Sequence, residues 1–202
     1  MNALLLAMQD KYGVAHDPAC YPNSTVLINK LNIRDAEELA EIEKALTESR
    51  AALFEPDFSI SDLSALCGIH YYLFQDIYPW AGALRTVDIS KGNTRFCTAA
   101  YVEKEANKLL RKLAGEHYLV GCSTSTVARL ADYYCELNVI HPFREGNGRT
   151  QRLFFELLAI NAGYGLDWSQ VEQHEWIQAN IAGYLGDLQP LETLFQRIIS
   201  RI

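Results

Sequence analysis

The sequence predicts a mainly α-helical protein of one domain with a short β-hairpin, and three observations support this prediction. Apolar residues recur every three or four positions along most of the chain, which is the spacing of a helix face. One segment instead alternates polar and apolar residues on both sides of Lys91-Gly92-Asn93, which is typical of a hairpin. No linker, internal repeat or low-complexity tract divides the 202 residues, so we expect residues 1–202 to form a single domain.

The N-terminal part is predicted to be irregular at first and then helical. Residues 1–30 carry turn signals and are expected to form no regular element. After them, Leu39, Ile42 and Leu46 recur at helical spacing inside the acidic stretch 35–48. This pattern predicts an amphipathic helix whose acidic face lies in water.

The remaining predicted elements are helical, apart from the hairpin. In chain order they are a core helix over 60–78, hairpin strands over 86–90 and 94–97, and helices over 101–113, 126–139, 149–162 and 164–202. Breaks are expected in the last of these near Gly186 and Pro190. The helical core is therefore expected within about residues 60–190.

The charge balance excludes several classes of partner. Eighteen Lys and Arg against 25 Asp and Glu give a net charge of −7, which argues against direct binding of nucleic acid, because that needs a basic face. The apolar stretch 3–8 follows no Lys or Arg and ends at once in polar residues, so it reads as neither a signal peptide nor a membrane span. We therefore expect a cytoplasmic protein with no membrane partner.

The five cysteines do not form a pattern for metal binding or redox chemistry. They are odd in number, scattered, and contain no CxxC pair. We expect free core thiols in a reducing compartment.

The segment from His141 to Arg152 is the most informative part of the sequence. It lies between two helical patterns, and its two glycines, on either side of Asn147, allow positive φ and a close approach of the backbone to a ligand. A glycine-rich turn that opens a helix presents unpaired N–H groups, which bind anions. Arg149 and Arg152 lie three residues apart on one face of that helix and can reach the same anion.

Two further residues suggest what kind of anion this is. Glu145 supplies the hard carboxylate oxygen that Mg²⁺ prefers beside a nucleotide, and His141 supplies a titratable imidazole. Together they fit phosphoryl or nucleotidyl transfer. A plain helix–loop–helix connector with a turn histidine remains the alternative from spacing alone. The segment is neither a P-loop nor a dinucleotide fingerprint, and Gln178 excludes a metalloprotease site at His174-Glu175.

The segment resembles the signature of the Fic family, HxFx(D/E)GNGRxxR. Every specified position is met, by His141, Phe143, Glu145, Gly146, Asn147, Gly148, Arg149 and Arg152. The resemblance extends over 70–82, Arg85, the hairpin and Gly186-Asp187, so that most of the chain from about residue 60 looks like a short bacterial Fic toxin of the FicT type. It implies a mainly helical fold in which the signature joins two central helices.

The resemblance also implies an activity, the transfer of AMP from ATP to a Tyr, Ser or Thr hydroxyl of a target protein with release of pyrophosphate. His141 would be the general base, Phe143 would anchor the loop, and Glu145 would hold Mg²⁺ against the phosphates. The implied phosphate-binding residues are Gly146, Asn147, Gly148, Arg149 and Arg152, with the two arginines on the β- and γ-phosphates.

Two regions outside the signature also take expected roles from the resemblance. The hairpin around Lys91, Gly92, Asn93 and Thr94 matches the flap that covers the nucleotide and docks the target by strand addition. An idle surface hairpin is the alternative. Adenine contacts are expected from Trp176, Asn180 and Tyr184, which could equally be core residues, whereas Tyr78, Trp80 and Arg85 are interpreted as structural.

Fic proteins are commonly held inactive by a helix carrying (S/T)xxxE(G/N), whose Glu pairs with the second signature arginine. No Ser or Thr of this chain is followed by Glu four positions later. We therefore expect a small separate antitoxin to supply that Glu to Arg152. The resemblance to FicT toxins also implies type II DNA topoisomerase subunits as targets.

Three other functions stay open on the sequence. A Doc-like protein kinase is disfavoured, because its loop departs from the signature at the second glycine, and this loop is complete. A UMP or phosphocholine donor is the second, because a phosphate site does not read the base. The third is a catalytically idle module that binds nucleotide.

Overall fold

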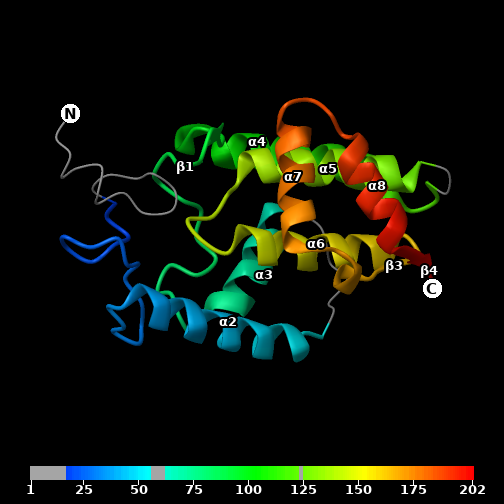
Figure 1. The fold of residues 1–202 in the computed structure, drawn as a ribbon. Helices are drawn as coiled ribbons and strands as arrows, with labels where there is room; N and C mark the ends of the chain where they lie inside the picture. Colours follow the sequence, from blue (N-terminus) through cyan, green and yellow to red (C-terminus); the bar gives the residue numbers. More distant parts are fainter. Residues whose placement is uncertain (1–16, 56–61, 123–124) are drawn as a thin grey trace.

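Helices make up most of the chain, as the apolar periodicity predicts, in a computed structural model that describes residues 17–55, 62–122 and 125–202 (Figure 1). The helices are α2 Ala36–Ala52, α3 Leu63–Phe74, α4 Val102–Gly115, α5 Thr126–Ile140, α6 Asn147–Asn161, α7 Gln173–Tyr184 and α8 Gln189–Ile198. Short 3-10 turns cover Ala99–Tyr101, His117–Leu119 and Trp168–Gln170, and the strands are β1 Ser90–Lys91, β2 Thr94–Arg95, β3 Tyr164–Leu166 and β4 Ile199–Arg201.

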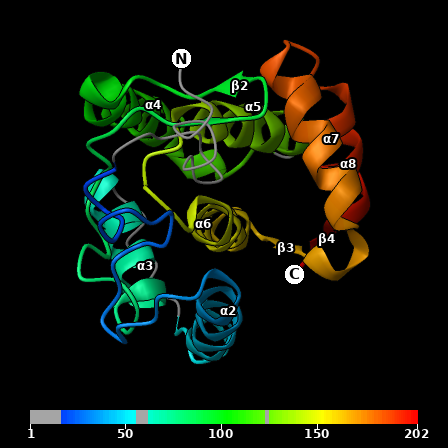
Figure 2. The same ribbon diagram turned by 60° about the vertical axis from the view of Figure 1, so that its left-hand side comes forward.

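Helix α6 lies in the middle of the molecule. Figure 2 looks nearly along its axis, with α2 below it, α3 to the left, α4 and α5 above, and α7 and α8 to the right. The core around it is aromatic and aliphatic, and burying each such side chain stabilises the fold by roughly 1.5–3 kcal/mol. Its largest fully buried members include Phe74, Phe143, Phe154, Phe155 and Phe195. The residues that precede α6 are therefore delivered to the centre of the fold.

Helices α2 and α3 begin at aspartate caps. The Asp35 carboxylate accepts hydrogen bonds from the Glu37 and Glu38 amides at 3.0 and 2.9 Å, and Asp62 does the same for Ser64 and Ala65 at 2.9 and 3.2 Å. Such caps satisfy the first unpaired N–H groups of a helix. The core helix expected over 60–78 is shorter than predicted, because α3 begins only after this cap and ends at Phe74.

The acidic face predicted for the first helix is not wholly in water. Glu43 and Thr47 are buried in α2 beside Leu39. Glu43 follows Leu39 by four residues and therefore lies on the apolar stripe rather than opposite it. The expectation was wrong for this one carboxylate, and its partners are described below.

The hairpin is present but shorter than expected. Only Ser90 pairs with Arg95 and Lys91 with Thr94, so Lys91 belongs to a strand rather than to the turn. Ile89 and Phe96 form a small apolar cluster at its base.

The prediction of helical structure over 164–202, broken near Gly186 and Pro190, was wrong at both ends. Residues 164–166 and 199–201 pair as an antiparallel sheet, with Leu166 opposite Ile199. At the first end, Gly163, at φ +88°, and Gly165 interrupt the helical pattern. At the second end, the apolar spacing of Ile198 and Ile202 also fits a helix, which explains the wrong prediction there. The expected breaks are confirmed, since α7 ends before Gly186 and Pro190 lies in the first turn of α8.

The expected irregular segment is confirmed where it is described, since residues 17–30 contain turns and a single bridge between Cys20 and Leu27, while residues 1–16 lie outside the described part. None of the five cysteines forms a disulfide bond; Cys20 and Cys135 are buried, and the other three are half-buried. In the described part of the chain, no helix is both long enough and apolar enough to cross a bilayer.

Candidate active site

The segment between α5 and α6 has two residues in the left-handed backbone region. His141 ends α5 with φ 48° and ψ 65°, and Gly146 precedes α6 with φ 77°. The ring of His141 turns back onto its own helix, where Nδ1 lies 3.1 Å from the carbonyl oxygen of Asn138. A carbonyl only accepts, so Nδ1 carries the hydrogen and Nε2 carries the lone pair. His141 is therefore held in the tautomer that a general base needs.

Burial keeps His141 neutral. Desolvation lowers the pKa of its imidazole to about 3, against the smaller raising effects of the Asn138 bond and of Glu145. The Phe96 ring stacks on the imidazole, with centroids 3.8 Å apart and planes 16° apart. The base of the hairpin thus forms one wall of the histidine pocket.

Arg85 connects the hairpin to this histidine. Its guanidinium donates to the carbonyl oxygens of His141 at 2.8 Å, Val87 at 2.7 Å and Ile140 at 3.2 Å, and also to that of Cys97. Its own amide donates to Pro142 O at 2.9 Å. A cation at the C-terminus of α5 satisfies carbonyls that the helix leaves unpaired. Arg85, which the sequence predicts to be structural, thus ties the end of α5 to the segments that precede and follow the hairpin.

The loop itself is braced from inside. The Asn147 side chain accepts from the Phe143 amide at 2.8 Å and donates to the Phe143 carbonyl at 2.7 Å. Buried His70 donates from Nε2 to the Glu145 carbonyl at 3.0 Å and accepts the Gly82 amide on Nδ1 at 2.8 Å. Phe143 stacks on the His70 ring at 4.0 Å, which agrees with its expected anchoring role.

Two close approaches hold the acidic end of the loop. A Cβ on Gly146 would lie 2.2 Å from the ring of Phe74, so only glycine fits there. The Gly146 amide donates to Glu145 Oε1 at 2.9 Å, which holds that carboxylate against the turn. Buried Arg144 pairs with buried Asp17 and ties the loop to the chain before α2.

The start of α6 is shaped to take an anion. Its N-cap is Gly146, which offers no side-chain acceptor to the first amides of the helix. Gly148, in the first turn, is exposed, and a Cβ there would meet only Arg152 Nη1 at 3.8 Å. Open amides at a helix N-terminus attract phosphate and carboxylate groups.

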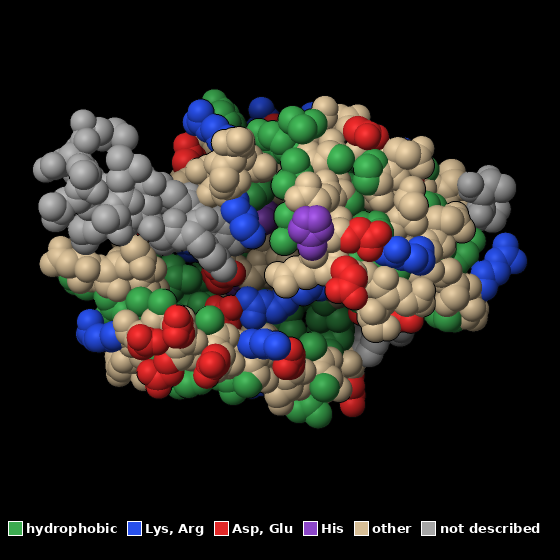
Figure 3. All heavy atoms as spheres, viewed as in Figure 1, with side chains coloured by type: hydrophobic (Ala, Val, Ile, Leu, Met, Phe, Trp, Pro, Cys, Tyr) green, Lys and Arg blue, Asp and Glu red, His purple; other side chains and the backbone are tan. Residues whose placement is uncertain are grey.

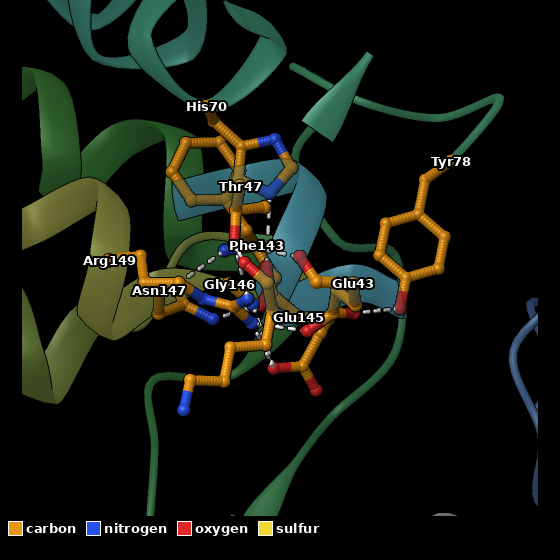
Figure 4. Close-up of polar contacts among 10 residues, drawn as sticks. Glu43, Thr47, His70, Tyr78, Phe143, Glu145, Gly146, Asn147 and Arg149 are labelled. Atoms are coloured by element: carbon orange, nitrogen blue, oxygen red, sulfur yellow. Dashed lines mark hydrogen bonds and ion pairs between the residues drawn. The ribbon is translucent and has the colours of Figure 1, made fainter. Parts of the chain in front are cut away.

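The two signature arginines are held differently. Arg149 donates to Glu43 of α2 and, at 3.0 Å, to Thr47 Oγ1, and its Nη2 lies 3.8 Å from Glu145 Oε1 (Figure 4). Arg152 is half-buried and makes no ion pair with the residues that the structure describes. Sequence reasoning missed Glu43 and Thr47; the available signal was their position in register with Leu39.

The surface view places this chemistry in a band of mixed charge. In Figure 3, acidic side chains gather over the outside of α2, and Lys and Arg side chains lie between α2 and the helices above it. The hairpin residues Lys91, Gly92 and Asn93 are exposed, and Thr94 is half-buried. The hairpin also borders a cavity of about 230 Å³, lined by residues 88–90 and 92–95.

The residues expected at the adenine lie on α7, away from the loop in sequence. Trp176 packs in an aromatic cluster with Tyr134 at 4.9 Å, Trp168 at 5.2 Å and Phe195 at 5.8 Å. Asn180 donates to the Trp176 carbonyl at 2.8 Å. Trp176, Asn180 and Tyr184 are all half-buried, and their role at adenine stays a prediction.

Glu145 fits a magnesium ion that is shared with phosphates. Among the described residues, no three His, Cys, Asp or Glu gather as a metal cage. Mg²⁺ needs no such cage beside a nucleotide, because one or two carboxylates plus phosphate oxygens and water complete its shell. The loop provides one buried carboxylate at the open start of α6, which suits this mode of binding.

Comparisons with known proteins point in the same direction. The family model described as Fic/DOC family matches residues 60–159. The chain is 50% identical to the probable protein adenylyltransferase Fic of Salmonella typhimurium, over 96% of this chain and 97% of that protein. It is 41% identical to the protein adenylyltransferase VbhT of Bartonella schoenbuchensis, over 93% of this chain and 40% of that longer protein.

Solved structures share the arrangement of helices. BepC of Bartonella tribocorum, crystallised with AMPPNP, superposes with a TM-score of 0.84 at 29% identity, over 91% of this chain and 97% of that one. The N-terminal Fic domain of a Bartonella quintana effector with bound ADP gives 0.84 at 30% identity, over 91% of this chain and 94% of that one.

The two signature glycines should respond differently to alanine. Gly146→Ala adds a methyl group against Phe74 at a positive φ, and we expect it to lower the free energy of unfolding by about 2–4 kcal/mol. Gly148→Ala meets open space at an ordinary helical position and should change it by less than about 1 kcal/mol. Urea denaturation followed by circular dichroism measures both. Equal losses in the two variants would contradict the described packing of the loop.

Stability should fall as the pH drops below 6.5. Burial lowers the pKa of His141 to about 3 and that of His70 to about 4, while unfolding returns each to about 6.5. The unfolded chain therefore binds protons that the native chain refuses, and each histidine costs about 1 kcal/mol of stability between pH 6.5 and pH 5.5. Denaturation at the two pH values should show the combined loss of stability from both histidines. The loss should be roughly halved in His141→Ala and unchanged in His174→Gln, because His174 is exposed. A parent protein equally stable at both would refute it.

Proposed function

The chain belongs to the Fic/DOC family, and on that premise we propose that it transfers AMP from ATP to a side-chain hydroxyl of a target protein and releases pyrophosphate. The observation that carries this proposal is the neutral His141, held with its lone pair on Nε2, beside the open N-terminus of α6. A base and an anion cradle at the two ends of one loop suit an attack by a hydroxyl on a phosphate.

In the proposed reaction, Nε2 of His141 accepts the proton of the attacking Tyr, Ser or Thr hydroxyl. The hydroxyl oxygen forms a bond to the α-phosphorus, and the bond from that phosphorus to the bridging oxygen breaks. Both bonding electrons leave with pyrophosphate. Because His141 is neutral at physiological pH, it can take this proton without first losing another.

The other signature residues bind and orient ATP in this proposal. The first amides of α6, from Asn147 and Gly148, face the phosphates, while Arg149 and Arg152 hold the β- and γ-phosphates in line for displacement. Glu145 holds Mg²⁺, which neutralises phosphate charge when bound. The side chain of Asn147 has a separate task, because it closes the loop onto Phe143.

The hairpin is proposed to dock the target. Its strands are only two residues long, and an extended segment of another protein can pair with the edge that they leave. Phe96, where the hairpin joins the rest of the chain, stacks on the ring of His141. A target segment docked on the hairpin would therefore lie beside the proposed general base. We assign the adenine to α7 residues Trp176, Asn180 and Tyr184.

We also propose that the protein is a cytoplasmic toxin restrained by a partner. No described Glu pairs with Arg152, and the chain has no (S/T)xxxE motif, so a small antitoxin would supply the restraining carboxylate. Type II DNA topoisomerase subunits are the proposed targets. DNA would then be affected only through another protein, which is consistent with the net charge of −7.

The position of a radioactive label in ATP distinguishes the proposed reaction from its alternatives. The protein incubated with a bacterial lysate and Mg²⁺ should label a target from α-³²P-ATP and not from γ-³²P-ATP. Label from the γ position would indicate a kinase, label from UTP but not ATP would indicate UMP transfer, and no label would indicate an idle module. His141→Ala should lower the transfer by about 10²–10⁴-fold because it removes the base, while ATP binding stays. His174→Ala serves as the matched control, because His174 is an exposed histidine at the start of α7.

Expression of this chain alone should arrest growth of a bacterial host, because the restraining Glu would lie in another protein. His141→Ala should abolish the arrest, and mass spectrometry of the arrested cells should find AMP on type II topoisomerase subunits. Unimpaired growth with a protein that transfers AMP in vitro would contradict the toxin role. AMP found only on other proteins would contradict the target.

A further inference from the structure

We propose that Glu43 of α2 is a positioning residue that aims Arg149 at the phosphates of ATP. The inference rests on the proposed function, because it assigns Arg149 a phosphate to meet. Glu43 lies 102 positions before Glu145 in the chain, and its role is visible only in the folded structure. Figure 4 shows it between Tyr78 on one side and Arg149 on the other.

The carboxylate of Glu43 is bound at both oxygens. Oε1 accepts from Nη2 of Arg149, and Oε2 accepts from the hydroxyl of Tyr78. The side chain is 10% exposed, and a carboxylate buried to this degree is costly unless both its oxygens are paired. Burial, followed by the charge of Glu43 beside it, raises the pKa of the Tyr78 hydroxyl, which therefore remains a donor. The geometry of Glu43 is thus fixed from two sides.

Thr47, one turn further along α2, completes the holder. Its hydroxyl donates to the Glu43 carbonyl at 2.8 Å, which leaves the oxygen to accept from Arg149 Nη1 at 3.0 Å. The flat guanidinium also lies over the ring of Phe74, with its central carbon 4.8 Å from the centroid. Two edge contacts and one face contact define the plane of a guanidinium, so little rotational freedom is left to lose on binding.

Glu43 also decides which carboxylate Arg149 engages. Arg149 lies between two acids, and the contact with Glu43 is a hydrogen bond, whereas Glu145 Oε1 is 3.8 Å away. Without the charge of Glu43, the guanidinium would be drawn to Glu145, which is the proposed magnesium ligand. Glu43 therefore holds Arg149 off Glu145 as well as in its plane. Arg152 has no comparable holder among the described residues.

Glu43→Gln tests the proposal, because it keeps the size of the side chain and removes its charge. We would measure the Kd of ATP and of AMP by calorimetry for the parent, Glu43→Gln, Tyr78→Phe, Arg149→Ala and Glu41→Gln, together with their melting temperatures. Glu41 is the matched control, since it is an exposed glutamate two residues away on the same helix. AMP lacks the β- and γ-phosphates, so its binding does not depend on Arg149.

We expect Glu43→Gln to weaken ATP binding by about tenfold, with AMP binding changed less than twofold and Glu41→Gln like the parent. Tyr78→Phe keeps the charge and loses one fixing bond, so it should shift ATP binding in the same direction by about two- to threefold. AMP binding also serves as the folding control, because it reports whether the site is intact in each variant.

Several outcomes would overturn the proposal. Equal weakening of ATP and AMP would mean that Glu43 only supports the fold. Unchanged or tighter ATP binding in Glu43→Gln would mean that Glu43 does not aim Arg149, or competes with the phosphates for it. If Arg149→Ala leaves ATP binding unchanged, the role of Arg149 in the proposed function fails and this inference fails with it. A dependence on Arg149 without a dependence on Glu43 rejects this inference alone.

Discussion

The hydrogen bonds that fix the carbonyl groups between α5 and α6 are the constraint on which the rest of the site depends. Arg85 holds the carbonyls of Ile140 and His141, Asn147 holds both backbone groups of Phe143, and His70 holds the carbonyl of Glu145. The six-residue segment that joins α5 to α6 through the core could not otherwise bury its peptide groups, since each unpaired one costs roughly 1–3 kcal/mol. Once these bonds form, the direction of the His141 ring and the start of α6 follow.

The same burial that packs these histidines into the core also sets their protonation state. His70 is a core aromatic residue stacked against Phe143 and Phe74, and burial lowers its pKa. Its Nε2 donates to the loop while its Nδ1 accepts the Gly82 amide, and only the neutral ring can do both. His141 is neutral for the same reason, because burial penalises its charged form. Excluding water therefore keeps the His141 imidazole unprotonated at physiological pH. The same exclusion makes the protein sensitive to acid, and structure and catalysis depend on one physical cause.

The sequence predicts the loop far better than its supports. His141 to Arg152 are contiguous, so their spacing alone shows a turn, a helix start and two arginines on one face. Arg85 and Glu43 lie 56 and 106 residues from the groups that they hold, and no local pattern expresses such contacts. The acidic stretch 35–48 predicts a solvated Glu43, although its register with Leu39 places it inward. Strands β3 and β4 escaped prediction because three-residue strands carry less periodic signal than the helices beside them.

The state of one side chain matters most for the proposed reaction, namely a neutral His141 with its hydrogen on Nδ1. Nitrogen-15 NMR of the histidine rings, assigned by comparison with a His141→Gln variant, measures that state directly. From pH 7.5 down to pH 5, the shifts should report a protonated Nδ1 and an unprotonated Nε2, with no titration near the ordinary pKa of 6.5. An imidazolium at pH 6, or a hydrogen on Nε2 at pH 7.5, would contradict the proposal that the fold presets this base.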